Sequence, residues 1–489
     1  MRLSRLVAAL AVLLTSSPTH AGPPEFRCQA RGGTAWRELR TEHFLVETDL
    51  PSRKARELAR ELEMMLGAVR YGLFRAPPTM PGTIRVVAFR SGEDFDLFAP
   101  ARADAFYTRS RWGEPVIVLP GVLAEAQRIV IAHELTHHVL ARAFARQPLW
   151  FSEGTATFME TVGSSGPDST PTMGGIPQWR YRSVFPYHGG IGAVLVAKGR
   201  LELKQYGLAW ALVHFLLNRH SRELGELQQR FARGADPAAA WREVFPQWDP
   251  ATPGGAEKLD DAIGRYLKSG RFGYRDVKLP PATEAVEHAM SASEAHAVRL
   301  ALPRYNRGKP FKPADQLAEA DEALSEDPAN VDALTVAARA RPEQALAAAR
   351  RAVELRPGDA RAWMHLSERL PKDDAAGRED ALRRAVQADP ESSMALNNLA
   401  WELLGAGRSG EALPLARKAA LLAPWNAATL DTLAGVHADL GQCDEALEVQ
   451  RRAIDVLPET ASAEDRRKLT ERLAQFQRQC RIVPAAPAP

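Results

Sequence analysis

Cysteine is scarce in this chain of 489 residues, where only Cys28, Cys443 and Cys480 occur. So few cysteines exclude a small fold held together by many disulfides. The length instead predicts two or three domains, each with its own core. Cys443 and Cys480 both fall in a C-terminal helical region. We expect these two to pair, which leaves Cys28 free.

Long apolar runs and an excess of charge are also missing. After the first residues, no segment approaches 18 uninterrupted apolar residues, whereas a membrane-spanning helix needs about 20. Removing Arg2 and Arg5 with an N-terminal leader lowers the 63 basic residues to 61, against 60 acidic ones, a net charge of +1. We therefore expect no nucleic-acid partner and no stable membrane insertion of the mature chain.

The first 21 residues have the pattern of a secretory signal peptide. Arg2 and Arg5 precede the apolar run Leu6–Leu14, and small and polar residues lead to Ala21. This pattern predicts cleavage after Ala21 and export to the periplasm or the medium. A retained membrane anchor is the alternative, although nine apolar residues are short for that role.

Residues 131–160, IAHELTHHVLARAFARQPLWFSEGTATFME, carry the clearest chemical motif. His133, Glu134 and His137 follow the order H-E-x-x-H. On a helix, residues i and i+4 project from one face, so His133 and His137 can offer two imidazoles to one ion. Zn²⁺ in catalytic sites usually takes three protein ligands and a water. The motif therefore predicts a zinc site with Glu134 as the general base.

The elements around this motif predict an α+β domain over residues 22–275. Strands are expected at 43–48, 83–89 and 115–119, and helices at 53–71, 149–159, 201–219, 223–231 and 256–268. Prolines and charges predict a linker with some helix over residues 276–312. The segment 163–177, rich in Gly, Ser, Thr and Pro, is expected to be a loop, either a lid or a tolerated insertion.

Beyond residue 313 the sequence repeats with a 34-residue step. The step recurs at prolines, alanines and other small or apolar positions: Pro390, Pro424 and Pro458; Ala385, Ala419 and Ala453; Gly407 and Gly441; Ala412 and Ala446. This period is typical of stacked helix pairs. Residues 313–480 resemble about four tetratricopeptide repeats in an all-α solenoid, followed by a disordered tail at 481–489. A plain helical bundle is the alternative.

The third zinc ligand distinguishes the metallopeptidase classes. A metzincin would need Gly at 140 and His at 143, where this chain has Leu140 and Ala143. Glu153 instead offers a carboxylate ligand. HELTHH followed by PLWFSEGTATFME resembles the peptidase MA-like, or gluzincin, metallopeptidases. The resemblance implies Zn²⁺ bound by His133, His137 and Glu153, and peptide hydrolysis assisted by Glu134.

Several other residues are weaker candidates. The resemblance places Tyr206 where several gluzincins have a tyrosine that stabilises the oxyanion, although a core aromatic is the alternative. Many gluzincins have an acidic residue four positions after the third ligand; Thr157 stands there, so either Thr157 or Glu160 would orient a ligand histidine. Glu160 is also an alternative third ligand. Further histidines are expected to lie in the core, at the surface or beside the site: His138, His188 and His214.

Together these features predict an exported zinc metallopeptidase with a protein or peptide substrate. Its solenoid is expected to recruit a protein partner or the substrate through its concave face. Deleting the solenoid should then leave turnover of a small generic peptide unchanged. The alternatives are an inactive, zinc-stabilised scaffold acting through its repeats, and a zymogen-like enzyme held inactive by the loop at 163–177.

Overall fold

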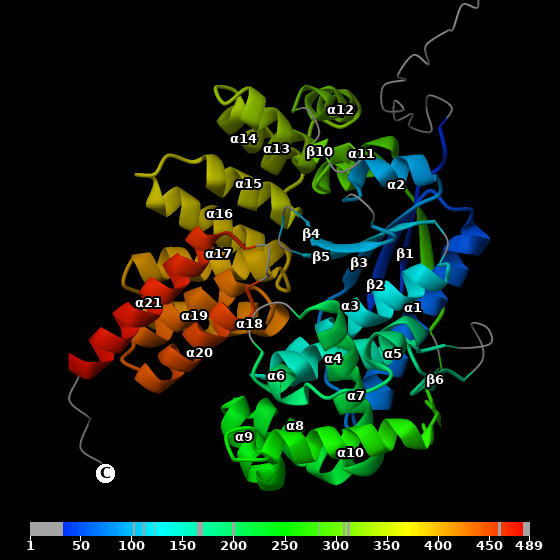
Figure 1. The fold of residues 1–489 in the computed structure, drawn as a ribbon. Helices are drawn as coiled ribbons and strands as arrows, with labels where there is room; N and C mark the ends of the chain where they lie inside the picture. The colour runs from blue at the N-terminus through cyan, green and yellow to red at the C-terminus, as the bar shows by residue number, and fades with distance from the viewer. Residues whose placement is uncertain are drawn as a thin grey trace, which may run out of the picture.

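The computed structural model describes residues 33–100, 103–110, 112, 114–121, 123–163, 170–197, 201–281, 283–306, 309–310, 313–457 and 461–482. The predicted signal peptide, Cys28, residues 164–169 of the predicted loop and residues 483–489 lie outside these ranges. The described chain is mostly helical, with a small mixed sheet in its N-terminal part (Figure 1). No described helix combines the length and apolar character needed to cross a bilayer.

Six strands form the sheet, in the order β4-β5-β3-β2-β1-β8. The strands β2, β3 and β5 run parallel and match the three predicted strands. The other three are antiparallel to their neighbours and were not predicted, because they are short and rich in polar residues. The bounds are β1 Arg37–Arg40, β2 Phe44–Thr48, β3 Ile84–Phe89, β4 Phe106–Arg109, β5 Pro115–Pro120 and β8 Val286–Ala289.

The segment 276–312 is not simply the linker that its composition predicted. Its strand β8 pairs with β1 at the sheet edge, and α11, Ala292–Ala301, begins at a capping box formed by Ser291 and Glu294. Val298 of α11 belongs to the same apolar cluster as Phe98 of α2, Gly92–Phe98. An edge strand tolerates polar side chains, so the composition of this segment concealed its place in the sheet.

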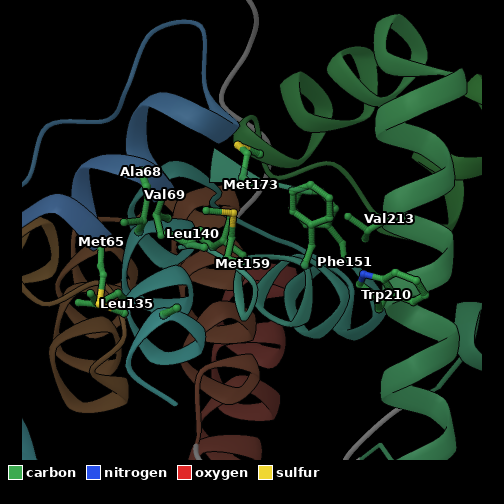
Figure 2. Close-up of a cluster of buried hydrophobic side chains, with 14 of the residues drawn as sticks. Met65, Ala68, Val69, Leu135, Leu140, Phe151, Met159, Met173, Trp210 and Val213 are labelled. Carbon is green, nitrogen blue, oxygen red and sulfur yellow. The ribbon is translucent and has the colours of Figure 1, made fainter. Parts of the chain in front are cut away.

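Helices cover both faces of the sheet. Side chains alternate along a strand, so Val86 of β3 contacts the cluster formed with α1, Ser52–Leu73, and α3, Glu125–Ala143. Val87 contacts the opposite cluster, with α2 and α11. Figure 2 shows Leu135 and Leu140 of α3 close to side chains of α1. The predicted apolar row of α3 thus fixes this helix against the core.

The rest of the N-terminal part is helical. Among these helices α7 is deeply buried, with most of its apolar residues enclosed. Its Trp210 and Val213 lie beside Phe151 of α4 (Figure 2). The bounds are α4 Leu149–Met159, α5 Gln178–Val184, α6 Ile191–Leu195, α7 Leu203–Arg219, α8 Ser221–Ala232, α9 Pro237–Val244, the 3-10 helix η2 Pro246–Trp248 and α10 Gly255–Ser269, with the short strands β6 Thr172–Met173, β7 Arg275–Asp276, β9 Tyr305–Asn306 and β10 Lys309–Pro310.

The predicted paired helices are present in the C-terminal part. We call α12 to α21 the helical array; within it α13 pairs with α14, α15 with α16, α17 with α18 and α19 with α20. The repeated alanines Ala385, Ala419 and Ala453 are all fully buried, because small side chains let paired helices approach closely. The bounds are α12 Pro313–Glu326, α13 Val331–Ala340, α14 Ala345–Leu355, α15 Ala360–Arg369, α16 Ala375–Ala388, α17 Ser393–Gly405, α18 Ser409–Leu422, α19 Ala427–Asp439, α20 Cys443–Asp455 and α21 Ala463–Ile482.

Two other features of the array, a pair of repeated glycines and a disulfide, have a clear structural role. Gly407 and Gly441 have φ angles of 71° and 73° at the turns between paired helices, a backbone region that favours glycine. The predicted disulfide between Cys443 and Cys480 joins α20 to α21. The last helix is thereby fixed to the final pair.

The helical array packs against the N-terminal part through α11, the β4–β5 turn and the end of α3 (Figure 1). In the β4–β5 turn, buried Trp112 donates a hydrogen bond from Nε1 to Asp332 of α13 at 3.0 Å, and its ring joins the apolar core of the array. At the end of α3, the Arg142 guanidinium lies 4.2 Å from the Trp425 ring centroid. Arg452 of α20 donates to the Ala141 carbonyl at 3.3 Å. Part of the array surface is therefore occupied by the chain itself.

Candidate metal centre

Two glycines bring the helices of the centre together. A Cβ at Gly154, next to Glu153, would lie 2.4 Å from the Ala209 carbonyl oxygen of α7. A Cβ at Gly207, next to Tyr206, would lie 2.8 Å from the Arg180 carbonyl oxygen of α5. Only glycine permits such close backbone contact. Helices α4, α5 and α7 therefore meet beside α3, and each carries a residue that approaches the predicted site.

His133, His137 and Glu153 converge as the sequence predicts. The two histidine Nε2 atoms are 3.1 Å apart. The Glu153 Oε2 atom lies 3.4 Å from Nε2 of His133 and 3.5 Å from Nε2 of His137. Ligands about 2.1 Å from a tetrahedral ion lie about 3.4 Å from one another. Three ligand atoms with this spacing fit the corners around a single zinc ion.

The charge environment also fits a cation. Burial alone would lower the pKa of His133, but hydrogen bonds with Glu153 and Glu160 and the nearby Glu134 charge raise it to about 9. Burial would raise the pKa of Glu153, but the two histidines hold it well below its usual range. The buried Glu153 Oε2 atom faces Nε2 of both histidines. The cluster therefore stabilises positive charge, and Zn²⁺ is the divalent ion that this His, His, Glu donor set suits.

The outer nitrogens of both histidines have polar partners. His133 Nδ1 lies 3.1 Å from Glu160 Oε1, and His137 Nδ1 lies 3.0 Å from Ser152 Oγ. If a metal binds Nε2 of each ring, Nδ1 carries the ring hydrogen and donates a hydrogen bond to the neighbouring oxygen. Thr157 Oγ1 is buried and reaches no hydrogen-bond partner among the described residues. Glu160 therefore lies on the side of His133 away from the three candidate ligand atoms, where it would orient the imidazole rather than bind the metal.

Sequence reasoning missed Ser152 and Arg180. Ser152 directly precedes Glu153, and a hydroxyl beside a predicted ligand was the only available signal. Arg180 Nη2 donates to Glu160 Oε1 at 2.8 Å, and its guanidinium lies 4.5 Å from the Tyr206 ring centroid. The link from Arg180 to His133 through Glu160 joins α5 to α3, and no local pattern in the sequence predicts it.

Replacing Ser152 by alanine should weaken zinc binding about tenfold, since losing a partner of a ligand histidine typically costs about 10-fold to 100-fold in affinity. Competition with a chromophoric chelator measures this change. Ser325→Ala is the matched control, because Ser325 is an exposed serine of α12 whose hydroxyl donates to the Glu322 carbonyl of its own helix. Equal zinc affinity in wild type and Ser152→Ala would contradict a role of Ser152 in orienting His137.

Two of the remaining predicted residues lie beside the three candidate ligands. Glu134 and half-buried Tyr206 line a cavity of about 720 Å³ beside the centre. The Tyr206 ring centroid is 6.5 Å from that of His133. The other residues around this cavity, which we call the metal cavity, are mostly apolar: Ile129, Val130, Trp179, Leu201 and Leu203, with His133, Glu160, Arg180 and Glu202. A substrate entering here would meet Glu134 and Tyr206 together.

The other histidines lie away from the centre. His138 is buried against Trp425 of the array, 4.6 Å between ring centroids. His214 is fully enclosed, within 2.6 Å of the Tyr266 hydroxyl, and burial lowers its pKa to about 4. His188 is exposed and does not line the metal cavity. His138 and His214 are thus neutral core residues.

Comparisons with known proteins give little further information. No protein-family profile matches the chain, and no curated protein matches it. Among solved structures it is similar to TTC0263, a thermophilic TPR protein of Thermus thermophilus, with 20% identity over 38% of this chain and 98% of that one, at a TM-score of 0.28. It is also similar to the MamA protein, with 18% identity over 36% and 89% of the two chains and a TM-score of 0.25, and to yeast Tom70, with 14% identity over 73% and 82% and a TM-score of 0.31.

Likenesses at these scores carry no argument about function. The assignment of paired-helix repeats is based on the 34-residue period and on the helix pairs of the chain itself.

Proposed function

We propose that this chain is an exported, zinc-dependent metallopeptidase. The observation that carries the proposal is the convergence of His133, His137 and Glu153 on one point at the edge of a cavity that Glu134 lines. The metal cavity is large enough for several side chains, which favours a protein or peptide substrate. The N-terminal pattern of residues 1–21 supports export.

The chemistry follows from the positions of the side chains. A zinc ion at this point would polarise the scissile carbonyl and lower the pKa of a bound water to about 7. Glu134, one residue after His133 and on the cavity wall, accepts the proton of the attacking water and passes it to the leaving amine. Tyr206 lines the same cavity, and its hydroxyl donates a hydrogen bond to the developing oxyanion. Glu160 and Ser152 hold the two imidazoles in the required orientation.

The helical array supports a second candidate function, a scaffold that binds proteins. Paired-helix arrays present extended surfaces to protein partners, and this array packs directly on the helix that carries His133 and His137. In this case the metal would stabilise the fold and Glu134 would have no chemical role. Partner binding through the array is compatible with both candidates.

Metal removal and restoration test the proposal. The purified chain should contain about one zinc ion per molecule. Extraction with a chelator should abolish cleavage of unfolded casein, and one equivalent of Zn²⁺ should restore it, whereas Mg²⁺ should not, because it prefers an all-oxygen octahedral site. Metal content and fragment release are the two measurements. A zinc-loaded chain that cleaves neither casein nor a broad panel of peptides would favour the scaffold.

A further inference from the structure

A second cavity of about 820 Å³ lies between α1 and the start of α3. We call it the distal cavity. Its floor is apolar and its rim is charged: the floor includes Leu58, Met64, Met65, Leu123 and Val162, and the rim includes Lys54, Glu57, Arg60, Glu61, Glu125 and Arg128. None of these residues belongs to the predicted metal site. These floor and rim residues therefore have no role in the chemistry proposed above.

The two cavities share a wall. Ile129, Glu160 and Trp179 line both of them. Trp179 is 44% exposed, an unusual position for a large apolar ring. The Arg180 guanidinium lies 3.6 Å from the Trp179 ring centroid, and Arg180 is itself bound by Glu160. The shared wall is thus held in place by the same residues that orient His133, and it faces open space on both sides.

The rim of the distal cavity favours neither positively nor negatively charged ligands. Lys54 pairs with Glu57 at 2.9 Å, and Arg128 pairs with Glu61. Paired charges at a surface attract a charged ligand weakly. The apolar floor is the feature that would bind a ligand, so the distal cavity favours a chain with apolar side chains over a phosphate-rich or strongly anionic ligand.

We propose that the metal cavity and the distal cavity together form one substrate groove. In this groove the distal cavity binds a polypeptide segment remote from the cleaved bond. This inference rests on the proposed function. One cavity of this size accommodates a ligand of drug size, so two adjoining cavities suit an extended, unfolded chain that passes over Trp179. Gly163, Ile176 and Pro177 also line the distal cavity. The described ends of the predicted loop at 163–177 therefore border the path of the substrate.

Binding to the inert Glu134→Gln chain, loaded with zinc, tests the groove without requiring turnover. The probes are two fluorescein-labelled alanine-rich peptides with blocked termini and one central leucine, of which the longer extends about six residues further on each side, or about 20 Å per side. Fluorescence anisotropy should show the longer peptide binding about tenfold more tightly. Equal affinity for the two peptides would overturn the proposal.

Filling the distal cavity gives an independent check. Gly163 lines the distal cavity, and among the described residues a Cβ there would meet only the Thr161 carbonyl oxygen, at 3.9 Å. Gly163→Trp should reduce the affinity ratio of long to short peptide to about one, whereas Gly225→Trp, at a glycine of α8 with no described atom within 4 Å of a Cβ, should retain it. A full ratio in Gly163→Trp would overturn the proposal.

Different results would contradict the proposed function and the proposed groove. If the wild-type chain hydrolyses neither peptide while Glu134→Gln retains the tenfold preference for the longer one, the groove binds polypeptide and the peptidase proposal is wrong. If the wild type hydrolyses both peptides with equal kcat/KM and Glu134→Gln binds both equally, the peptidase stands and the groove is wrong.

Discussion

Glu134→Gln is expected to retain about one zinc ion per chain and to lower peptide hydrolysis by about 10²-fold to 10⁴-fold. The amide keeps the size of the side chain on the wall of the metal cavity, but it does not accept the proton of the attacking water. It also leaves His133, His137 and Glu153 in place as ligands. Metal analysis and initial rates on one unfolded protein substrate measure both effects. A variant with wild-type rates would exclude Glu134 as the base.

Two variants serve as controls for this result. Glu226→Gln changes an exposed carboxylate of α8 that lines neither the metal cavity nor the distal cavity, and it should change neither zinc content nor rate. His133→Ala removes a ligand and should lose both together. If wild type and Glu134→Gln are equally inert while His133→Ala loses zinc and melts at a lower temperature, the metal is structural and the scaffold is the better conclusion.

Deleting the helical array from residue 313 is expected to unfold or aggregate the N-terminal part. The sequence alone predicted unchanged turnover, because two separate domains were expected. In the structure the array covers Trp112 and contacts α3 at His138 and Arg142. Removing it would expose the Trp112 ring and leave Arg142 and its neighbours without their contacts on the helix that carries His133 and His137. Circular dichroism melts and zinc content of the truncated chain measure the effect.

Single substitutions measure the contribution of this interface to stability separately from the effect of deleting the whole array. Trp112→Ala should lower the free energy of unfolding by about 3–5 kcal/mol, as for other buried tryptophans. Trp401→Ala is the matched control, because Trp401 belongs to the array but is 47% exposed, and its loss should cost less than about 1 kcal/mol. A truncated chain with wild-type zinc content and melting temperature would show that the two parts fold independently.

Local patterns in the sequence predicted those features of the structure that depend on residues close together along the chain. The spacing of His133 and His137 needs only the i, i+4 geometry of one helix, and the 34-residue step reports the repeated turns at Gly407 and Gly441. The strands β3 and β5 were also recognisable as short apolar runs, and β2 as an alternating, β-branched segment. These features follow from backbone geometry and side-chain burial within short segments.

The sequence by itself therefore determined the helix of the metal motif, the three parallel strands and the paired helices, and it predicted which three side chains would converge. Only the tertiary structure decided that Glu160 and Ser152, and not Thr157, face the outer nitrogens of the histidines. The tertiary structure alone also showed that α3 packs against Trp425 and that β8 joins the sheet. In each case the two partners come from different elements, and their meeting depends on how close those elements pack, as at Gly154 against Ala209.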